Sequence, residues 1–455
     1  MALKPSTIAL ISTAVAASFG IGYLIYFDHK RRNDPQYKKQ KKLERKKAAK
    51  LEKEFKQKEV QSVETLIKYV IDKVNAETFP TTAEAVEAYF VDQVALGEEC
   101  IKQGQEEASV EHFYKALKIY PAPLELIMIY QKTVPEKVYR LIVTIMAMEQ
   151  QQRQNKFYEE FPPSETRLKL KEVSKEGENS IYGLVAEESI KAGDEIYAEK
   201  PLVAALYPQL QGSYCSYCMK KLNDQPVECA NCDQVKFCSK ECEQTATQQY
   251  HQFLCTNNKL SLDQKASSFL NFSVDNKLQY PQMIAQFLSG MVAEEVEKNK
   301  TGKPTSTYTN WDHIERFKSE PLEISQASIK EATLIKELLS SKIPGLDEFL
   351  KDDIYLLMKS KLIGNCFEVA TNEQGFVPVE KSDQEPIRVL NNHQKGLGSA
   401  IYKISSYIGS DKEGNVDVNF KDNTNVVVVK ATKEIAQGEQ IKVSITDSVT
   451  PYTIE

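Results

Sequence analysis

The sequence predicts a multidomain protein with an N-terminal transmembrane helix, an all-α domain, and an α+β domain interrupted by a small cysteine-rich module. Three observations support this fold class. The chain has 455 residues, more than one ordinary domain. An uncharged run of 23 residues separates Lys4 from Asp28, and seven of the nine cysteines fall between Cys215 and Cys255. Apolar residues make up 41% and charged residues 27%, which excludes a wholly disordered chain and a multi-spanning membrane protein.

The uncharged run predicts a membrane anchor at residues 1–27. At about 1.5 Å per residue, such a helix reaches roughly 34 Å, which is enough to span hydrocarbon. A cleaved signal peptide is the alternative, but it would have a shorter apolar stretch, leading basic residues and a small-residue cleavage site. Here only Lys4 precedes the run and the basic residues follow it. The positive-inside rule then places the rest of the chain in the cytosol.

Residues 28–59 predict a basic, helical stalk that can touch anionic headgroups. They contain 14 Lys/Arg and 6 Asp/Glu, a net charge of +8. Nucleic-acid binding is the weaker interpretation of this run, because it lies against the predicted membrane. The whole chain carries a net charge of -6, which also argues against nucleic acid as its main partner.

Residues 60–153 predict an all-α domain. A capping box at Thr81-x-x-Glu84 opens a helix that Gly104 ends, and prolines separate further helices at 106–119 and 124–133 from a last one through Met148. Leu96-Gly97 followed by Ser109-x3-Phe113-x2-Ala116-x4-Pro121 matches one tetratricopeptide-repeat unit. Because one unit cannot bury both of its faces, flanking helices must cover one side, and the other can remain an apolar groove.

The order of anchor, basic stalk, AYFVDQVALGEE, one repeat unit and PLELIMIYQKTVPEKVY resembles the twenty-kilodalton presequence-receptor subunit of the mitochondrial outer-membrane translocase, the TOM complex. The resemblance covers about residues 1–150. It implies a single-pass outer-membrane receptor that binds the apolar face of basic, amphipathic presequences and meets other TOM subunits through its membrane helix. The resemblance places the presequence groove at Phe90, Val91, Val94, Leu126, Ile129 and Tyr130.

The physical properties of this region agree with a groove. Positions 90, 91 and 94 share one helical face, and so do positions 126, 129 and 130. Residues 60–160 contain 16 acids and 10 bases, which suits attraction of arginine-rich presequences. The alternative is that both apolar stripes are simply core. Residues 149–163 are polar, rich in Gln and end in two prolines, and they predict a linker.

A cysteine and histidine cluster at residues 215–255 predicts two zinc ions. Eight potential ligands are spaced Cys-x2-Cys-x10-Cys-x2-Cys-x5-Cys-x3-Cys-x8-His-x3-Cys, and tetrahedral zinc takes four. The spacing resembles the MYND finger with its interleaved sites. The resemblance implies that Cys215, Cys218, Cys238 and Cys242 hold one ion, and Cys229, Cys232, His251 and Cys255 the other. With no ligand position left for water, both ions are expected to be structural. The finger then either binds short partner segments or staples a larger domain.

The segments around the finger resemble the SET-and-MYND family of protein lysine methyltransferases. KAGDEIYAEKPLV precedes the finger, and VVVVKATKEIAQGEQIKVS follows a helical stretch from about 262 to 362. The resemblance implies a pseudoknotted SET fold over residues 164–455, split by the finger at 215–255.

Three positions depart from the chemistry that this resemblance implies. Ser180 or Ile181 replaces the first Gly of the cofactor turn, Ile408-Gly409-Ser410-Asp411 replaces Asn-His-Ser-Cys, and Ile445 replaces the tyrosine that orients the amine. Asn392-His393 lacks the following Ser-Cys and is interpreted as loop. We therefore assign no catalytic residue and expect no S-adenosylmethionine binding.

The sequence thus favours an outer-membrane import receptor with a non-enzymatic appendage. An outer-membrane-tethered, S-adenosylmethionine-dependent protein lysine methyltransferase is the alternative. A zinc-stapled adaptor that recruits a cytosolic factor is a third hypothesis, compatible with the first.

Overall fold

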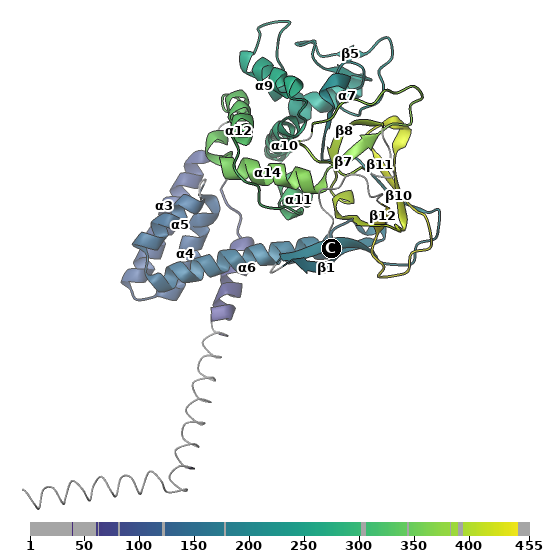
Figure 1. Ribbon diagram of the computed structural model, residues 1–455. Coiled ribbons are helices and arrows are strands. Elements are labelled where there is room, and N and C mark those ends of the chain that lie inside the picture. Colours follow the sequence, from purple (N-terminus) through teal and green to yellow (C-terminus); the bar gives the residue numbers. More distant parts are fainter. Residues whose placement is uncertain are drawn as a thin grey trace, which may run out of the picture. The chain divides into compact units, whose positions relative to one another are not determined.

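The computed structural model describes residues 39, 61, 63–80, 82–120, 123–176, 179–301, 306–343, 345–382, 384–389 and 395–444. The described residues form two compact units, with the boundary between Arg153 and Gln154 (Figure 1). The predicted anchor at 1–27 lies outside the described residues, and so does the predicted stalk apart from Lys39. Within the described ranges, no helix combines the length and the apolar character needed to cross a membrane.

The first unit is helical throughout its described part. Residues 63–75 form a helix. Four more follow: α3 (Ala83–Lys102), α4 (Glu106–Ile119), α5 (Pro123–Thr133) and α6 (Glu136–Glu160). Gly104 turns the chain between α3 and α4 with a φ of +74°, which other residues rarely adopt. Gly97 lets the two helices approach closely, because a Cβ there would lie 2.9 Å from the ring of Phe113.

Helix α6 corrects the predicted linker at 149–163. It runs without interruption through Glu160, since Gln, Arg, Lys and Glu are good helix formers. Its last turn belongs to the second unit, where Phe157 is fully buried and stacks on Phe161 with 5.0 Å between ring centroids. The second unit therefore starts at Gln154 and not at residue 164.

The described part of the second unit contains two larger sheets, a small hairpin within the finger and a longer hairpin. The longer hairpin pairs β1 (Leu168–Glu176) with β2 (Asn179–Ala186). A five-stranded sheet has the order β3 (Glu195–Glu199), β11 (Val427–Ala431), β10 (Val416–Phe420), β12 (Lys442–Ser444) and β9 (Gly409–Asp411). Strand β12 runs parallel to both of its neighbours, and the other pairs are antiparallel. A three-stranded sheet has the order β4 (Val203–Leu206), β8 (Gly396–Ile401) and β7 (Phe367–Ala370).

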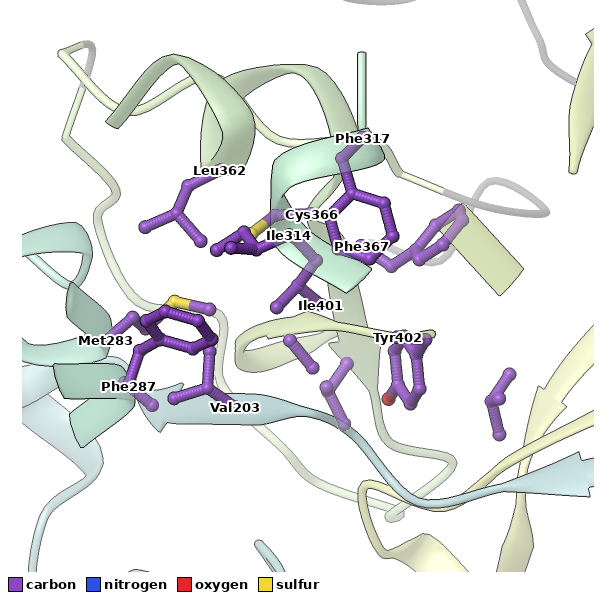
Figure 2. Packing of buried hydrophobic residues seen from close by; sticks show 14 of the residues in the cluster. Val203, Met283, Phe287, Ile314, Phe317, Leu362, Cys366, Phe367, Ile401 and Tyr402 are labelled. Carbon is purple, nitrogen blue, oxygen red and sulfur yellow. The ribbon is translucent and has the colours of Figure 1, made fainter. Parts of the chain in front are cut away.

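Helices fill the stretch between the finger and β7, as predicted for residues 262–362. They are α9 (Gln264–Asp275), α10 (Tyr280–Thr301), α11 (Asn310–Arg316), α12 (Gln326–Leu339), α13 (Leu346–Phe349) and α14 (Asp352–Asn365). Figure 2 shows their apolar side chains meeting the three-stranded sheet: Met283 and Phe287 of α10 and Leu362 of α14 lie near Val203 and Ile401. This shared core fixes the sheets, the helices and the finger in one unit.

Candidate functional site

The structure gathers the eight predicted zinc ligands into two groups, and the grouping is the one that the MYND resemblance implies. Cys215, Cys218, Cys238 and Cys242 form one group, and Cys229, Cys232, His251 and Cys255 form the other. In each group the four ligand atoms lie within 4.8 Å of one another.

The distances within each group fit a tetrahedral metal. Sγ of Cys238 lies 3.5 Å from Sγ of Cys218 and 3.6 Å from Sγ of Cys242. In the second group, Sγ of Cys232 lies 3.5 Å from Nε2 of His251. A zinc–sulfur bond of about 2.3 Å makes the edge of a tetrahedron about 3.8 Å, so these separations suit zinc. Each group already supplies four ligands, which is the pattern of a structural site.

Local structure positions these ligands. Strands β5 (Val227–Glu228) and β6 (Lys236–Phe237) form a small hairpin between the cysteine pairs. Helix α7 (Lys240–Ala246) begins at Ser239, whose Oγ accepts a hydrogen bond from the amide of Cys242. A π-helical turn at Thr247–His251 and a short helix α8 (Gln252–Leu254) follow it and lead to Cys255. Burial lowers the pKa of His251 to about 4, so its ring is neutral at pH 7, as metal ligation requires.

The finger is hydrogen-bonded to the connection between β10 and β11. The backbone amide of Asn425 donates to the carbonyl of Cys218 at 2.9 Å, and its side chain donates to the carbonyl of Tyr217 at 2.8 Å. Tyr402 Oη donates in turn to the carbonyl of Asn425 at 2.7 Å. These bonds favour the interpretation of the finger as a staple within a larger domain.

The six predicted groove residues do not all lie at the surface. Val91 is 57% exposed and Ile129 is 49% exposed, while Phe90 and Val94 are half-buried. Leu126 and Tyr130 are only 3% exposed and belong to the core of the first unit. Their role is therefore corrected from contact surface to support.

Packing explains the tyrosine at position 130. Tyr130 Oη donates to the carbonyl of Phe113 at 3.2 Å, and the two rings lie 5.2 Å apart in an edge-to-face arrangement. Sequence reasoning missed Met128, which is 56% exposed beside Ile129. The sequence feature that could have indicated Met128 is the unbroken apolar run of α5. Because two faces of this helix are apolar, the sequence alone does not show which face is core and which is surface.

Acidic side chains accompany the exposed apolar residues of α3. Glu87 lies one turn before Val91, and Glu98 lies one turn after Val94. Both carboxylates are on exposed residues. A basic amphipathic helix has an apolar face and a positively charged face. Exposed aliphatic side chains complement the first face, and acidic side chains on the same helix complement the second.

Side chains at and near the segments expected to hold S-adenosylmethionine make hydrogen bonds within the chain. Asn365 Nδ2 donates to the carbonyls of Lys318 and Lys361, both at 2.8 Å. The guanidinium of Arg388 donates to the carbonyl of Ile408 and to Oγ of Ser410, both at 3.0 Å.

Strand β2, which carries the expected cofactor turn, also makes contacts within the second unit. Ser180 is exposed and its Oγ donates to the carboxylate of Glu172 at 2.6 Å, while the ring of Tyr182 is stacked against Tyr158. A cofactor that used the face of Tyr182 would have to displace Tyr158. Ile445 and Asn392-His393 lie outside the described residues.

Comparisons with known proteins bear on both units. The model of the family described as "MAS20 protein import receptor" matches residues 10–159, and the model of the "MYND finger" matches residues 215–255. "Mitochondrial import receptor subunit TOM20" of Saccharomyces cerevisiae is 37% identical over 141 residues, which cover 30% of this chain and 76% of the relative. Its counterpart of Neurospora crassa is 38% identical over 151 residues, covering 31% and 81%.

A further relative matches a longer stretch. "Protein-lysine N-trimethyltransferase SMYD5" of Homo sapiens is 23% identical over 338 residues, covering 58% of this chain and 76% of the relative. The helical unit, the paired zinc-ligand groups and these matches define a protein import receptor joined to a MYND-finger module with similarity to SET-and-MYND proteins. The chain belongs to the TOM20 family of mitochondrial import receptors through its first third.

Proposed function

We propose that this protein is a receptor in the mitochondrial outer membrane that binds basic, amphipathic presequences of precursor proteins as part of the TOM complex. The observation that carries the proposal is the set of exposed aliphatic side chains on the family-matched unit, Val91 on α3 and Met128 and Ile129 on α5, which we call the aliphatic strip. The half-buried Phe90 and Val94 continue this strip toward the core. The domain boundaries that we propose are an anchor at 1–27, a basic stalk at 28–59 and a receptor domain at 60–153.

Energetics favour this strip as a binding surface for an amphipathic helix. Burying one aliphatic side chain contributes about 1.5–3 kcal/mol, so the three exposed side chains contribute about 4.5–9 kcal/mol. A micromolar complex needs about 8 kcal/mol after the entropic cost of association, so contacts with the half-buried residues and attraction between charges must supply the remainder. Acidic residues on the same helix attract the basic face of the presequence and raise the association rate.

Fluorescence anisotropy of a labelled presequence peptide with residues 60–455 tests the proposal. We expect micromolar binding, and we expect Ile129→Ser to weaken it by at least tenfold. Val143→Ser is the matched control, because Val143 is a 39% exposed aliphatic residue on α6. Absence of binding by the unmodified chain, or an equal loss in both variants, would contradict the proposal.

We propose that the second unit, a SET-like domain stapled by the MYND finger, is not catalytic. The engagement of Asn365, Ile408 and Ser410 by other groups of the chain supports this, as does the cover over Tyr182. The rival function, a tethered protein lysine methyltransferase, requires S-adenosylmethionine binding. Isothermal titration calorimetry decides between them: we expect no heat of binding, and a micromolar dissociation constant would establish the rival.

A further inference from the structure

A pocket lies between the zinc finger and the helices α9 and α10 of the second unit. Phe237 and His251 line it from the finger, Phe269 from α9 and Gln282 from α10. The volume of this pocket is about 50 Å³. A water molecule needs about 10–15 Å³, so the pocket has space for several waters or for one small organic group.

Three polar atoms in this pocket have no partner. Ser216 Oγ, Thr256 Oγ1 and Gln282 Oε1 are all buried and make no hydrogen bond. Thr256 is only 4% exposed, so its hydroxyl does not form a hydrogen bond to bulk solvent. Each buried polar atom without a partner costs about 1–3 kcal/mol, and three in one pocket indicate a guest that supplies hydrogen bonds.

Acidic and basic side chains do not line this pocket: among the described residues around it, none is Asp, Glu, Lys or Arg. A carboxylate guest would lose its hydration without gaining a counter-charge, and it has no donor for the side-chain oxygen of Gln282. Carboxylates are therefore excluded on energetic grounds.

The aromatic side chains that line the pocket favour a flat guest. Phe237, Tyr250 and Phe269 contribute aromatic surface. Tyr250 Oη already donates to the carbonyl of Ser216 at 3.2 Å, so this tyrosine offers mainly its ring. A guest must therefore be planar, with a donor for an amide oxygen and an acceptor for hydroxyl groups, a combination that neither a carboxylate nor an ammonium group offers.

We propose that this pocket binds a primary carboxamide. The group is planar and neutral, and its N–H donates to Gln282 Oε1 while its carbonyl accepts from the hydroxyls of Thr256 and Ser216. The terminal amide of Gln282 is itself complementary to a second carboxamide in either orientation. The carboxamide can come from a free small molecule or from a Gln side chain of a partner peptide. The site is independent of the proposed presequence receptor.

Saturation-transfer NMR on the full-length, zinc-loaded chain in detergent tests the proposal with propionamide. We expect a saturable signal for propionamide and none for propionate, its charged counterpart. A second arm compares acetyl-Gly-Gln-Gly-amide with the same peptide carrying Glu. Binding of propionamide alone identifies a free amide as the guest, and Gln-dependent peptide binding identifies a partner side chain.

Gln282→Met keeps the volume of the side chain but removes its amide, and we expect it to weaken propionamide binding at least tenfold. Asn271→Ala on α9 removes an exposed amide and serves as the matched control. Thr256→Val is the second variant if Gln282→Met fails to fold, and the zinc content of each variant reports an intact finger.

No signal with any amide would mean that the pocket holds only water, and an equal signal with propionate or in Gln282→Met would mean non-specific contact. Either result overturns the proposal.

Discussion

The rings of Tyr158 and Tyr182 stack face to face, with 3.6 Å between their centroids and 3° between their planes. Tyr158 lies in the last turn of α6, and Tyr182 lies on β2. The last turn of α6 thus packs on the strand that carries the expected cofactor turn. The contact lies wholly within the second unit, and it makes the residues after Gln154 part of that unit's core.

Phe157, the neighbour of Tyr158 in the last turn of α6, is the centre of a second aromatic cluster, and its removal should destabilise the second unit. The ring is fully buried and lies 4.9 Å from the ring of Tyr308 and 5.4 Å from that of His313. Arg316 adds a cation–π contact at 4.6 Å. We expect Phe157→Ala to lower the free energy of unfolding by about 3–5 kcal/mol. Urea unfolding followed by near-ultraviolet circular dichroism measures the change.

The control for this variant is Lys156→Ala. The Lys156 side chain is 66% exposed, and its ion pair with Glu160 at 3.7 Å is a surface contact worth at most about 1 kcal/mol. If Phe157→Ala unfolds at the same urea concentration as Lys156→Ala, the last turn of α6 does not contribute to the fold as described.

This turn also shows what the sequence could not reveal. Helices 106–119 and 124–133 were predictable because glycine and prolines mark their ends, and the zinc groups were predictable because ligand spacing is local. The burial of Phe157 depends on Tyr308 and His313, about 150 residues further along the chain, so no local pattern encodes it. A polar, Gln-rich composition therefore predicted a linker, although the aromatic residues at 157, 158 and 161 already shared one helical face.

The proposed presequence surface was only partly predictable for a different reason. Helix α5 is apolar on two faces, and helical periodicity alone does not say which face meets the rest of the unit. The tertiary contact between Tyr130 and Phe113 decides the question, and it turns Met128 and Ile129 outward.

The two zinc groups should respond separately to mutation. Cys229→Ser removes one ligand of the second group and leaves the first group complete, so we expect bound zinc to fall from about two ions to about one per chain. Inductively coupled plasma mass spectrometry of the dialysed protein gives the ratio. Cys100→Ser is the matched control, since Cys100 lies in neither group, and it should retain both ions. Two ions in the Cys229→Ser protein would refute this ligand assignment.

Acid should destabilise the second unit through His313. Burial lowers the pKa of His313 to about 3, whereas the pKa of an unfolded histidine is about 6.5. The stabilising contribution is therefore complete above pH 6.5 and is lost as the pH falls toward 3, because the unfolded chain binds the proton first. Between pH 7.5 and pH 5 the loss should be about 2 kcal/mol.

The histidine contribution is obtained as a difference between two proteins. His313→Phe keeps a ring in the aromatic cluster and removes the titrating group, so its free energy of unfolding should fall less over the same pH interval. Zinc release from His251 affects both proteins equally and cancels in the comparison. Parallel pH curves for the two proteins would show that His313 does not titrate between the folded and unfolded states as its burial implies.

Charge beside the aliphatic strip should control the rate and salt dependence of presequence binding. Glu87 is exposed one turn from Val91, so Glu87→Lys should repel a basic presequence and weaken its binding by about 2- to 10-fold at moderate salt. Raising the ionic strength from ~0.1 M to ~1 M shortens the Debye length from about 10 Å to about 3 Å and should abolish the difference. Glu337→Lys on α12 changes the net charge equally at an exposed site of the second unit and should have little effect. Stopped-flow association rates separate the two cases, and equal rate changes in both variants would assign the attraction to net charge and not to the acids of α3.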